Sequence, residues 1–446
     1  MTAEEARTIT PAARLRGELR VPGDKSISHR ALMLALLAKG ESRITAAGDG
    51  ADIRSTAGIV ARLGATVERV REDGRTVDYR VISPGVDDLR QPDGPLDCGN
   101  SGTSLRLFSG ILAGLPMTAT LDGDASLRSR PVARIIEPLR LMGATVAGRD
   151  GDTLPPVSVT GRSPLRPIEY RTAVPSAQVK SAILFAALRA DGRTTVREAV
   201  ATRDHTERML RARGVAVERI VEADGCVAIS LDGGGRVLPV DERVPGDASG
   251  AAFWLVAGAI HPDAALRIFD VGVNPTRRAI IDILRAMGAR VDERITSPAA
   301  DDGVGEPIAT LTIRSSRLTA IDLSPVDVAS AIDEIPILCL AATQATGTTH
   351  IRGAGELRHK ESDRLTGIQA GLSALGADIR VDGDDITITG PTPLTGGPTD
   401  SLDDHRLAMT FAIAGLVAGG STRVARPGSA SISYPGFFTE IERLRA

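Results

Sequence analysis

The heptad RVPGDKS at residues 20–26 recurs as RVPGDAS at residues 243–249. Six of the seven residues are identical, and the offset of 223 positions is half of the 446-residue chain. Chance is a poor explanation for such a match, whereas an internal duplication accounts for both the identity and the offset. We therefore expect two related halves, each beginning at one copy of the heptad.

Each half divides again by three. Five segments combine a helix-like run, a glycine and a strand-like run, and their glycines lie 71 to 88 residues apart: Gly64, Gly143, Gly214, Gly288 and Gly376. A glycine directly after a helix suits the left-handed C′ position, where a Cβ atom would clash. A sixth helix, 437–446, ends the chain with no strand after it. The N-terminal segment, with its strand-like residues 15–21, is expected to complete that last unit.

A second set of helices is predicted in the same rhythm. Each apolar run follows a stretch rich in Gly, Pro, Ser or Asp, as helix starts require. The runs are 27–38, 103–113, 177–188, 248–260, 332–345 and 405–417. Short β-branched stretches between the helices predict strands at 76–82, 226–231, 310–315 and 386–389. The predicted fold is an α/β architecture of six units, each with two helices and several strands.

The duplicated heptads also suggest the domain division. Residues 23–244 would form one domain of three units, and residues 1–22 with 245–446 would form a second, discontinuous one. The chain would cross between the domains near 20–24 and near 243–247. Proline and glycine at both crossings suit a hinge, and a hinge of two crossings permits clamp-like closure. The alternative is a rigid linker.

Composition excludes several classes of protein. Apolar residues make up 42% and charged residues 24%, and the net charge of −3 gives no basic excess that would indicate nucleic-acid binding. Cys98, Cys226 and Cys339 form no CxxC pair, so neither a disulfide framework nor a zinc knuckle is supported. The longest apolar run has 14 residues, whereas a membrane span needs about 20. We expect a cytoplasmic protein with no metal, cofactor, nucleic-acid or membrane partner.

Lysine is rare: only 4 of the 53 basic residues are Lys, namely Lys25, Lys39, Lys180 and Lys360. A general bias toward arginine explains the scarcity. The lysines that remain are then enriched at positions where a compact ammonium cannot be replaced by a planar guanidinium. Three of the four, all but Lys39, fall in the polar motifs described next.

Polar residues gather where the predicted helices begin. The stretches are PGDKSISHR (22–30), GNSGTSLR (99–106), RSRP (128–131), SAQVKS (176–181), IDEIP (332–336), RHKESDRL (358–365) and DDHR (403–406). A helix N-terminus favours anions, and basic residues in a first turn are explained if an anion lies between them. Taken singly, each stretch could be ordinary capping or a solvated face. At helical spacing Lys360 and Arg364 would share a face, with Glu361 adjacent.

The convergence of these stretches points to a site. Equivalent helix starts in related units would gather six cations: Lys25, Arg30, Arg130, Lys360, Arg364 and Arg406. Two acids, Asp333 and Glu361, would lie among them, and an acid beside an apolar helix is one way to tune a general base. Glu334 and His405 could be structural. This combination predicts a site for more than one polyanion with acid–base machinery, and without a Rossmann or P-loop fingerprint.

These motifs, together with TRDHTE (202–207), resemble those of the 5-enolpyruvylshikimate-3-phosphate synthase family, in the same order and over essentially the whole chain. TRDHTE is most similar to the bacterial class II form. The resemblance implies two domains of three βαβαββ units, an inside-out α/β barrel. It also implies transfer of the enolpyruvyl group of phosphoenolpyruvate to the 5-hydroxyl of shikimate 3-phosphate, with release of phosphate, by addition and elimination.

The resemblance further implies which residues bind each substrate. The shikimate 3-phosphate site would comprise Lys25, Ser26, Arg30, Ser176, Gln178, Arg203, Asp333 and Lys360. The phosphoenolpyruvate site would comprise Lys25, Gly102, Arg130, Gln178, Glu361, Arg364 and Arg406. Lys25, Asp333 and Glu361 would be catalytic, with Asp333 taking the hydroxyl proton and Glu361 protonating the methylene carbon. The chain would act as a monomer on these two small molecules.

Two departures from the family pattern and two alternatives stay open. Many relatives carry Lys where this chain has Ile432, and glyphosate-tolerant class II enzymes carry Ala where it has Gly102. One alternative is the sister enolpyruvyl transferase that acts on UDP-N-acetylglucosamine, which uses a loop Cys as an acid; no Cys here has a matching context. The other is a non-catalytic repeat scaffold, which would not need acids among its cations.

Overall fold

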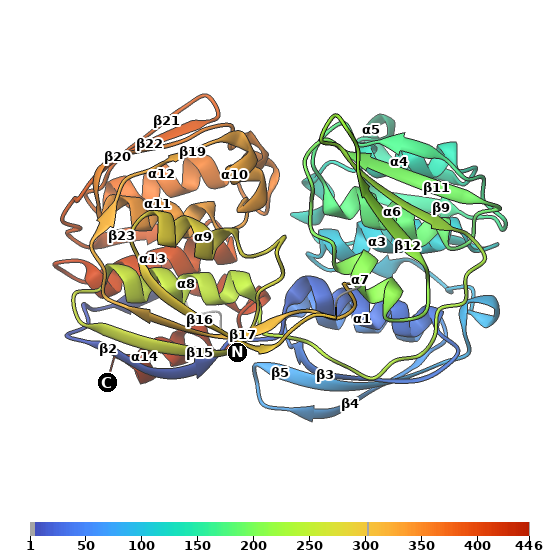
Figure 1. Cartoon of the computed structure of the whole chain (residues 1–446), viewed down its shortest axis with the longest axis horizontal. Coiled ribbons are helices and arrows are strands. Elements are labelled where there is room, and N and C mark those ends of the chain that lie inside the picture. Colours follow the sequence, from blue (N-terminus) through green and yellow to red (C-terminus); the bar gives the residue numbers. More distant parts are fainter. Residues whose placement is uncertain (1–4, 301–302, 446) are drawn as a thin grey trace. The chain divides into compact units, whose positions relative to one another are not determined.

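The computed structural model describes residues 5–300 and 303–445, which group into two compact units (Figure 1). Unit 1 comprises Met1–Asp24, Pro245–Pro298 and Pro307–Ala446, and unit 2 comprises Lys25–Val244 and Ala299–Glu306. The segment 299–306 thus groups with unit 2, whereas the sequence division placed it with 245–446. One contact that ties it to unit 2 joins Glu306 Oε1 to His205 Nδ1 at 2.7 Å.

Three central helices in each unit are buried along nearly their whole length. They are α1 (Lys25–Leu37), α3 (Gly102–Ala113) and α6 (Ala177–Ala187) in unit 2, and α8 (Ala248–Ile260), α11 (Ile335–Thr343) and α13 (His405–Val417) in unit 1. Helices that are apolar all round must be buried on all sides. All six were predicted, but the run 332–345 becomes helical only at Ile335 and is preceded by a separate helix, α10 (Pro325–Ser330).

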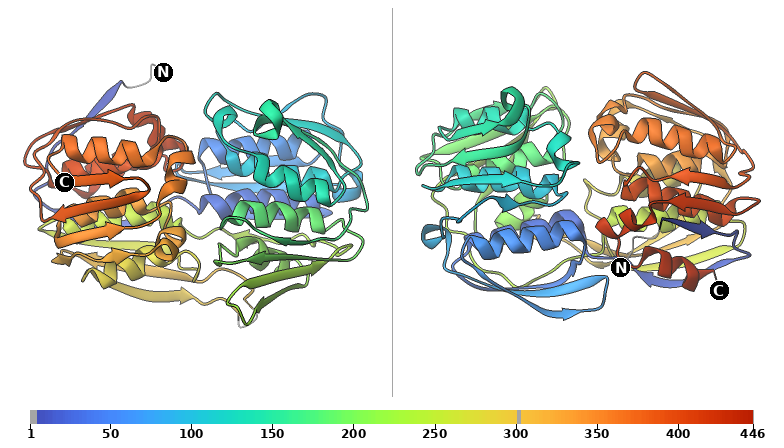
Figure 2. Two further views of the ribbon diagram at one scale, coloured as in Figure 1. Left: turned by 90° about the horizontal axis from the view of Figure 1, so that it is seen from above. Right: turned by 180° about the vertical axis from the view of Figure 1, so that it is seen from behind.

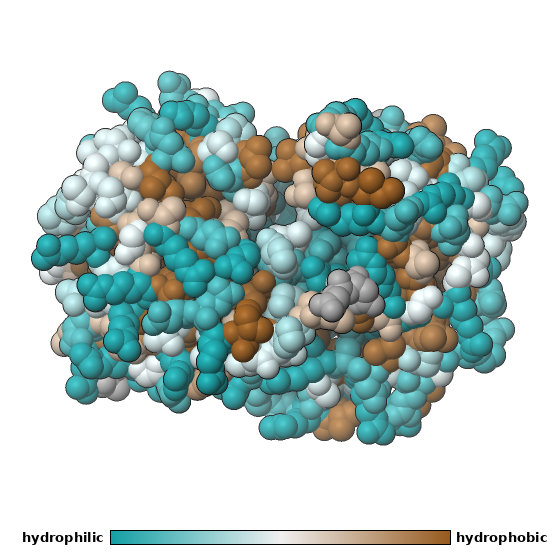
Figure 3. All heavy atoms as spheres, viewed as in Figure 1, coloured by the Kyte–Doolittle hydropathy of each residue, from teal (hydrophilic) through white to brown (hydrophobic). Residues whose placement is uncertain are grey.

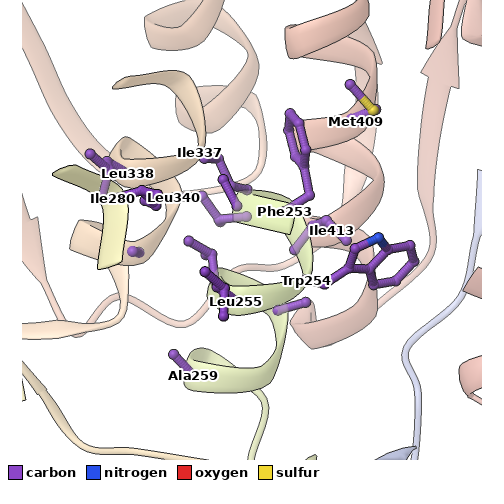
Figure 4. Close-up of a cluster of buried hydrophobic side chains, with 14 of the residues drawn as sticks. Phe253, Trp254, Leu255, Ala259, Ile280, Ile337, Leu338, Leu340, Met409 and Ile413 are labelled. Carbon is purple, nitrogen blue, oxygen red and sulfur yellow. The ribbon is translucent and has the colours of Figure 1, made fainter. Parts of the chain in front are cut away.

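The apolar contacts between the central helices of unit 1 form its core (Figure 4). Phe253 and Trp254 of α8 pack with Ile337 of α11 and Met409 of α13, and the Trp254 indole donates to the Tyr434 hydroxyl at 2.9 Å. Because these helices offer no polar flank, their polar groups are concentrated at their N-terminal ends.

In unit 2, the backbones of α3 and α6 pack directly against each other. A Cβ atom on Gly110 of α3 would lie 2.1 Å from the carbonyl oxygen of Ala182 on α6. Only glycine fits there, so the backbones of the two helices pack in direct contact.

Besides α10 and the short α5 (Arg149–Asp152), six further helices of the described residues lie outside this central set, and the five predicted C′ glycines follow five of them. The helices are α2 (Ala51–Arg62), α4 (Ala133–Leu141), α7 (His205–Arg211), α9 (Ala279–Ala286), α12 (Arg364–Ala374) and α14 (Phe437–Leu444). The φ angles are 112° at Gly64, 101° at Gly143, 78° at Gly214, 94° at Gly288 and 93° at Gly376. All are left-handed, which confirms the repeat derived from the glycines.

Six sheets accompany the helices in the described part of the chain, and each combines parallel with antiparallel pairing. Unit 2 has three four-stranded sheets. The strand order of the first is β14 (Glu242–Arg243), β3 (Gly40–Gly48), β5 (Thr76–Ser83), β4 (Thr66–Glu72), and that of the second is β6 (Leu96–Asp97), β7 (Thr118–Asp122), β9 (Leu154–Thr160), β8 (Thr145–Gly148). The strand order of the third is β10 (Glu169–Arg171), β11 (Arg193–Glu198), β13 (Val227–Asp232), β12 (Val217–Val221). In unit 1 the strand orders are β16 (Arg290–Ser297), β17 (Ile308–Arg314), β15 (Ala264–Gly272), β2 (Leu15–Arg20); β18 (Leu318–Thr319), β20 (Ala345–Ile351), β22 (Asp385–Gly390), β21 (Asp378–Asp382), with β19 (Asp322–Leu323) also on β20; and β1 (Ala6–Ile9), β24 (Thr422–Ala425), β23 (Gly397–Asp400).

The N-terminal segment does complete the last sheet, but not with the expected strand. β1 pairs antiparallel with β24, whereas residues 15–20 form β2, which pairs in parallel with β15 of a different sheet. β2 leads into the first heptad yet lies in the sheet that follows the second; β14, before the second heptad, pairs with β3 after the first. In Figures 1 and 2 the blue N-terminal strand β2 lies beside the red C-terminal helix α14.

The two heptads lie side by side. Gly23 and Gly246 form an antiparallel bridge, the Asp24 amide donates to the Pro245 carbonyl at 2.7 Å, and the Asp247 amide donates to the Pro22 carbonyl at 2.9 Å. The duplicated sequences therefore pair with each other, and each contains a point where the chain passes between the units.

The face shown in Figure 3 is mainly hydrophilic, with hydrophobic residues in small groups. Within residues 5–300 and 303–445, none of the helices combines the length and the apolar character that a membrane crossing would require.

Candidate active site

The ammonium of Lys25 is anchored at the start of α1 in unit 2. Its Nζ lies 2.5 Å from Oδ2 of Asp52 on α2, a carboxylate that is itself only 5% exposed. An ion pair this close to a buried carboxylate fixes the position of the ammonium. Lys25 is therefore not a solvated capping residue, which was the alternative interpretation of this motif.

Arg30, one turn further along α1, is buried and joins three helices. Its Nε donates to Thr206 Oγ1 on α7 at 2.7 Å, Nη2 donates to Ser181 Oγ on α6 at 2.8 Å, and Nη1 donates to the Ser26 carbonyl at 2.9 Å. Arg30 and Ser26 thus lie in one hydrogen-bonded group with the start of α1.

His29 is buried beside this group and makes a different contact. Its Nδ1 lies 2.7 Å from Thr56 Oγ1, which in turn bonds Ser104 of α3. Burial, with Lys25 and Arg30 nearby, holds the pKa of His29 well below its ordinary value, so the imidazole is neutral near pH 7.

Gly102, Arg130 and Gln178 come together through Arg106. Arg106 of α3 donates from Nη1 to Gln178 Oε1 at 2.7 Å, and the Gln178 amide donates to Thr103 Oγ1 at 3.0 Å. A Cβ atom on Gly102 would lie 2.8 Å from Arg106 Nη1 and 3.7 Å from Arg130 Nη1. Three of the residues predicted to bind phosphoenolpyruvate are therefore neighbours. The sequence motif GNSGTSLR did not single out Arg106 as a site residue, although a lone arginine in an apolar helix is a signal of a buried polar contact.

The remaining predicted residues of unit 2 lie at or after the start of α6. Ser176 is the N-cap of α6 and its hydroxyl accepts from the Val179 amide at 3.4 Å, so capping accounts for its position. Arg203 lies in the loop between β11 and α7. That loop is held by the buried Lys180, whose Nζ lies 2.9 Å from Glu198 and 2.8 Å from Glu207. Burial alone would lower the pKa of Lys180, but these two carboxylates outweigh it and raise the pKa.

In unit 1, two predicted cations converge on Asp333, just before α11. Lys360 Nζ lies 3.6 Å and Arg364 Nη1 3.5 Å from Asp333 Oδ1. Asp333 keeps some access to solvent, since its side chain is 18% exposed. A carboxylate held between an ammonium and a guanidinium, and still accessible, can exchange a proton with a bound ligand.

The acid Glu361 belongs to the same group through Arg364. Arg364 Nη2 donates to Glu361 Oε2 at 2.5 Å, and Arg364 Nε donates to Oδ2 of the buried Asp404 at 2.7 Å. Burial would lower the pKa of Arg364, but Asp404, Glu361 and Asp333 outweigh it and raise the pKa. The guanidinium therefore stays charged although it is 2% exposed.

The segment RHKESDRL does not form the continuous helix that was expected. Residues Gly355–His359 form a 3-10 turn, Lys360 is extended, and α12 begins only at Arg364, with the Asp363 side chain accepting from the Thr366 amide as its N-cap. Lys360 and Arg364 therefore do not share a helix face; they meet because both contact Asp333. The alternative of a solvated charged face is wrong for Arg364, which is buried.

Arg406, the second residue of α13, is linked to this group through Asp404. The Asp404 side chain caps α13 by accepting from the Arg406 amide at 2.8 Å, and Arg406 Nη1 lies 3.9 Å from Glu334 Oε1. Asp404 was not among the predicted site residues, although it contacts Arg364 and caps the helix that carries Arg406. Its position in DDHR was the available signal.

The cysteines bear on the alternative that needs a thiol acid. Burial raises the pKa of Cys339 to about 12, and burial with Asp97 nearby raises the pKa of Cys98 far above its ordinary value. Both thiols are buried, and neither is suited to give up a proton near neutral pH.

Comparison with known proteins agrees with this geometry. The family model of EPSP synthase (3-phosphoshikimate 1-carboxyvinyltransferase) matches residues 9–441. A 3-phosphoshikimate 1-carboxyvinyltransferase of Gloeobacter violaceus is 49% identical over 442 residues, covering 99% of both chains, and one of Bacillus thuringiensis is 44% identical over 439 residues, covering 98% of this chain and 99% of its own.

Solved structures show the same fold. An EPSP synthase of Acinetobacter baumannii superposes with a TM-score of 0.84 at 39% identity, covering 98% of this chain and 97% of its own. The enolpyruvyl transferase NikO of Streptomyces tendae has a TM-score of 0.77 at 21% identity, covering 99% of this chain and 98% of its own, a likeness of fold alone.

The fold is that of the enolpyruvyl transferases. Within that class, the chain belongs to the EPSP synthase (3-phosphoshikimate 1-carboxyvinyltransferase) family. It is a transferase of the shikimate pathway: it moves the enolpyruvyl group of phosphoenolpyruvate to the 5-hydroxyl of shikimate 3-phosphate and releases phosphate.

Proposed function

We propose that this reaction is carried out by the residues predicted from the motifs. Shikimate 3-phosphate is assigned to Lys25, Ser26, Arg30, Ser176, Gln178, Arg203, Asp333 and Lys360. Phosphoenolpyruvate is assigned to Lys25, Gly102, Arg130, Gln178, Glu361, Arg364 and Arg406. The observation that carries the assignment is the contact of Lys360 and Arg364 with Asp333, because it sets an accessible carboxylate among cations beside a second acid, Glu361.

The chemistry follows as two steps. In the addition, the 5-hydroxyl oxygen bonds to C2 of phosphoenolpyruvate while Asp333 takes the hydroxyl proton and Glu361 gives a proton to the methylene carbon, which becomes a methyl group. In the elimination, Glu361 takes a proton back from that methyl group, the C2–O bond to phosphate breaks, and the phosphate leaves with the proton from Asp333. The sum is one enolpyruvyl ether and one phosphate, with both acids returned to their starting states.

The cations serve the charged groups in these steps. Lys25 and the arginines stabilise the phosphate and carboxylate charges of the substrates, and fixed charges need no rearrangement when the reaction begins. The anchoring of Lys25 by Asp52 and of Arg364 by Asp404 supports this role, because both cations are held in place before any ligand is bound.

The domain division belongs to the same proposal. The predicted domains, residues 23–244 and residues 1–22 plus 245–446 but with 299–306 now grouped with the first, would act as two domains hinged near 20–24 and 243–247, and shikimate 3-phosphate would draw them closed because its proposed ligands come from both. The protein acts as a cytoplasmic monomer on these two small molecules, and it neither binds nucleic acid nor works at a membrane.

One assay tests the assignment against the sister activity. Phosphate release from phosphoenolpyruvate is measured with shikimate 3-phosphate, with UDP-N-acetylglucosamine, and with neither. Release that depends on shikimate 3-phosphate is expected. Release that depends on UDP-N-acetylglucosamine would contradict the substrate assignment.

A further inference from the structure

Glu334, which has no part in the reaction steps above, lies in a buried ionic group of unit 1. Its Oε1 accepts a hydrogen bond from the Ser249 hydroxyl and lies 3.8 Å from Arg277 Nη1 and 3.9 Å from Arg406 Nη1. The Glu334 side chain is 3% exposed. A buried carboxylate between two guanidiniums needs an explanation, because burying charges is costly unless they are paired.

Capping of α11 does not supply that explanation. Glu334 occupies the N-cap position of α11, but its side chain makes no capping hydrogen bond. Its carboxylate instead contacts α8 through Ser249 and the start of α13 through Arg406. The contacts of Glu334 therefore concern side chains on other elements.

Arg277 supplies the charge balance on the far side of Glu334. It is buried, and it lies 3.3 Å from Asp247 Oδ1 and donates to Ser249 Oγ at 2.6 Å. Burial would lower the pKa of Arg277, but Glu334, Asp24 and Asp247 outweigh it and raise the pKa. Arg277 and Ser249 together hold the Glu334 carboxylate, so that it can act on Arg406 from a fixed position.

The Glu334 carboxylate attracts Arg406 but does not occupy the hydrogen-bond donors of its guanidinium. At 3.9 Å the pair is too long for a hydrogen bond, so Glu334 attracts the guanidinium but leaves its donors open. Among the described residues, the buried Nε of Arg406 has no hydrogen-bond partner. A buried guanidinium with open donors is suited to receive an anion.

We propose that Glu334 is a positioning residue for phosphoenolpyruvate: held by Ser249 and Arg277, it orients the Arg406 guanidinium for the anionic substrate. The proposal rests on the assignment of Arg406 to phosphoenolpyruvate made above. Glu334 itself touches no reacting atom in this scheme, so its loss affects phosphoenolpyruvate and leaves shikimate 3-phosphate binding largely unchanged.

The test is Glu334→Gln, which keeps the shape of the side chain and removes its charge. We expect kcat/KM for phosphoenolpyruvate to fall by roughly 10- to 100-fold, the range for loss of one charged contact, while KM for shikimate 3-phosphate stays within about threefold. The matched control is Glu293→Gln on β16. Glu293 is also a carboxylate of unit 1 between two arginines, with its side chain 9% exposed, 3.0 Å from Arg278 and 3.1 Å from Arg285, but it is outside the site. We expect it to leave both KM values unchanged.

A second pair of variants separates this proposal from the assignment of Arg406. If Arg406→Lys leaves kcat/KM for phosphoenolpyruvate unchanged, the assignment itself fails. If Arg406→Lys is impaired and Glu334→Gln is not, the positioning role is overturned. If Glu334 acts through Arg406, the double variant loses no more than about threefold beyond the worse single variant.

Ser249→Ala keeps the proposal testable should Glu334→Gln fail to fold. It removes the hydrogen bond to Glu334 without changing any charge. We expect a smaller loss, again confined to phosphoenolpyruvate. Equal losses for both substrates in either variant would indicate a merely structural role and would overturn the proposal.

Discussion

Asp24 and Asp247, the equivalent acids of the two heptads, lie beside the same guanidinium: Arg277 Nη2 is 4.0 Å from Asp24 Oδ2 and 3.3 Å from Asp247 Oδ1. One cation therefore serves two carboxylates at the points where the chain passes between the units. Burial, with Asp24 nearby, raises the pKa of Asp247 from 3.8 to about 6, even though Arg277 opposes the shift.

This relationship predicts a pH-dependent stability. Because the pKa of Asp247 is raised in the folded state, the folded protein binds the proton more tightly than the unfolded chain. Protonation of Asp247 therefore contributes up to about 3 kcal/mol to the free energy of unfolding. This contribution is fully present below pH 3.8 and is lost as the pH rises through about 6.

The variant Asp247→Asn should flatten this dependence, since the amide still accepts from the Ser249 amide as the N-cap of α8 but cannot ionise. Urea denaturation at pH 4.5 to 7.5 measures the free energy of unfolding of the variant and of the parent protein. Asp263→Asn is the control, because Asp263 is exposed. Parallel pH profiles for Asp247→Asn and the parent protein would contradict the account.

Lys25 should not tolerate arginine. A planar guanidinium cannot take the place of the compact ammonium that lies 2.5 Å from the buried Asp52 carboxylate. Turnover of Lys25→Arg is expected to fall by at least roughly 100-fold, with folding intact. Lys39→Arg is the control, because Lys39 is 67% exposed and its Nζ is 3.5 Å from Asp88. Near-native turnover of Lys25→Arg would mean that its ammonium has no special role.

We expect the enzyme to be glyphosate-sensitive, because it has Gly102 where glyphosate-tolerant class II relatives carry Ala. A Cβ atom at this position first meets Arg106 Nη1, at 2.8 Å, so Gly102→Ala must move the guanidinium that holds Gln178. The variant should weaken the inhibitor by roughly ten- to a hundredfold, about 1–3 kcal/mol, and phosphoenolpyruvate by less, because the inhibitor is longer.

Inhibition constants competed against phosphoenolpyruvate decide this prediction. Gly58→Ala on α2 is the control, because a Cβ atom there meets nothing within 4 Å. A parent enzyme unaffected by millimolar glyphosate would refute the prediction and direct attention to other residues, including Ile432 at the end of a 3-10 turn.

Shikimate 3-phosphate should also compact the protein if its ligands come from both domains. The ligand shifts the population toward a closed state only because it binds that state better. Small-angle scattering with saturating ligand is expected to give a smaller radius of gyration, and phosphoenolpyruvate alone serves as the control. An identical profile with and without shikimate 3-phosphate would contradict closure.

Local signals in the sequence were sufficient for most of the fold. The glycine after each helix has a steric cause that acts within a few residues, so the left-handed φ at Gly64 and Gly376 could be predicted. Strand partners could not be predicted in this way. β2 pairs with β15, some 250 residues away, and nothing in the alternation of residues 15–20 names that partner.

The candidate site, like the fold, could be predicted where the signals are local and could not be predicted where they are distant in sequence. The residue types and their places at helix starts indicated Lys25, Asp333 and Arg364, because anion binding at a helix start is a local effect. Some of the partners that fix these side chains are distant in sequence. The buried Arg364 donates from its Nε to Asp404, which follows 40 residues later in the chain, at 2.7 Å. Contacts of that kind, and the contact of Arg106 with Gln178, depend on tertiary packing. The sequence carried local signals for Asp404 and Arg106 themselves, but nothing in it named their partners.

The central claim is that Asp333 and Glu361 move the protons, and the most direct measurement is the rate of phosphate release by Asp333→Asn and Glu361→Gln at saturating substrates. Each variant should bind shikimate 3-phosphate within about tenfold of the parent while its turnover falls by roughly 10²–10⁴. Asp327→Asn is the control, because Asp327 only forms the capping box of α10. Turnover of either acid variant within about threefold of the parent would contradict the claim.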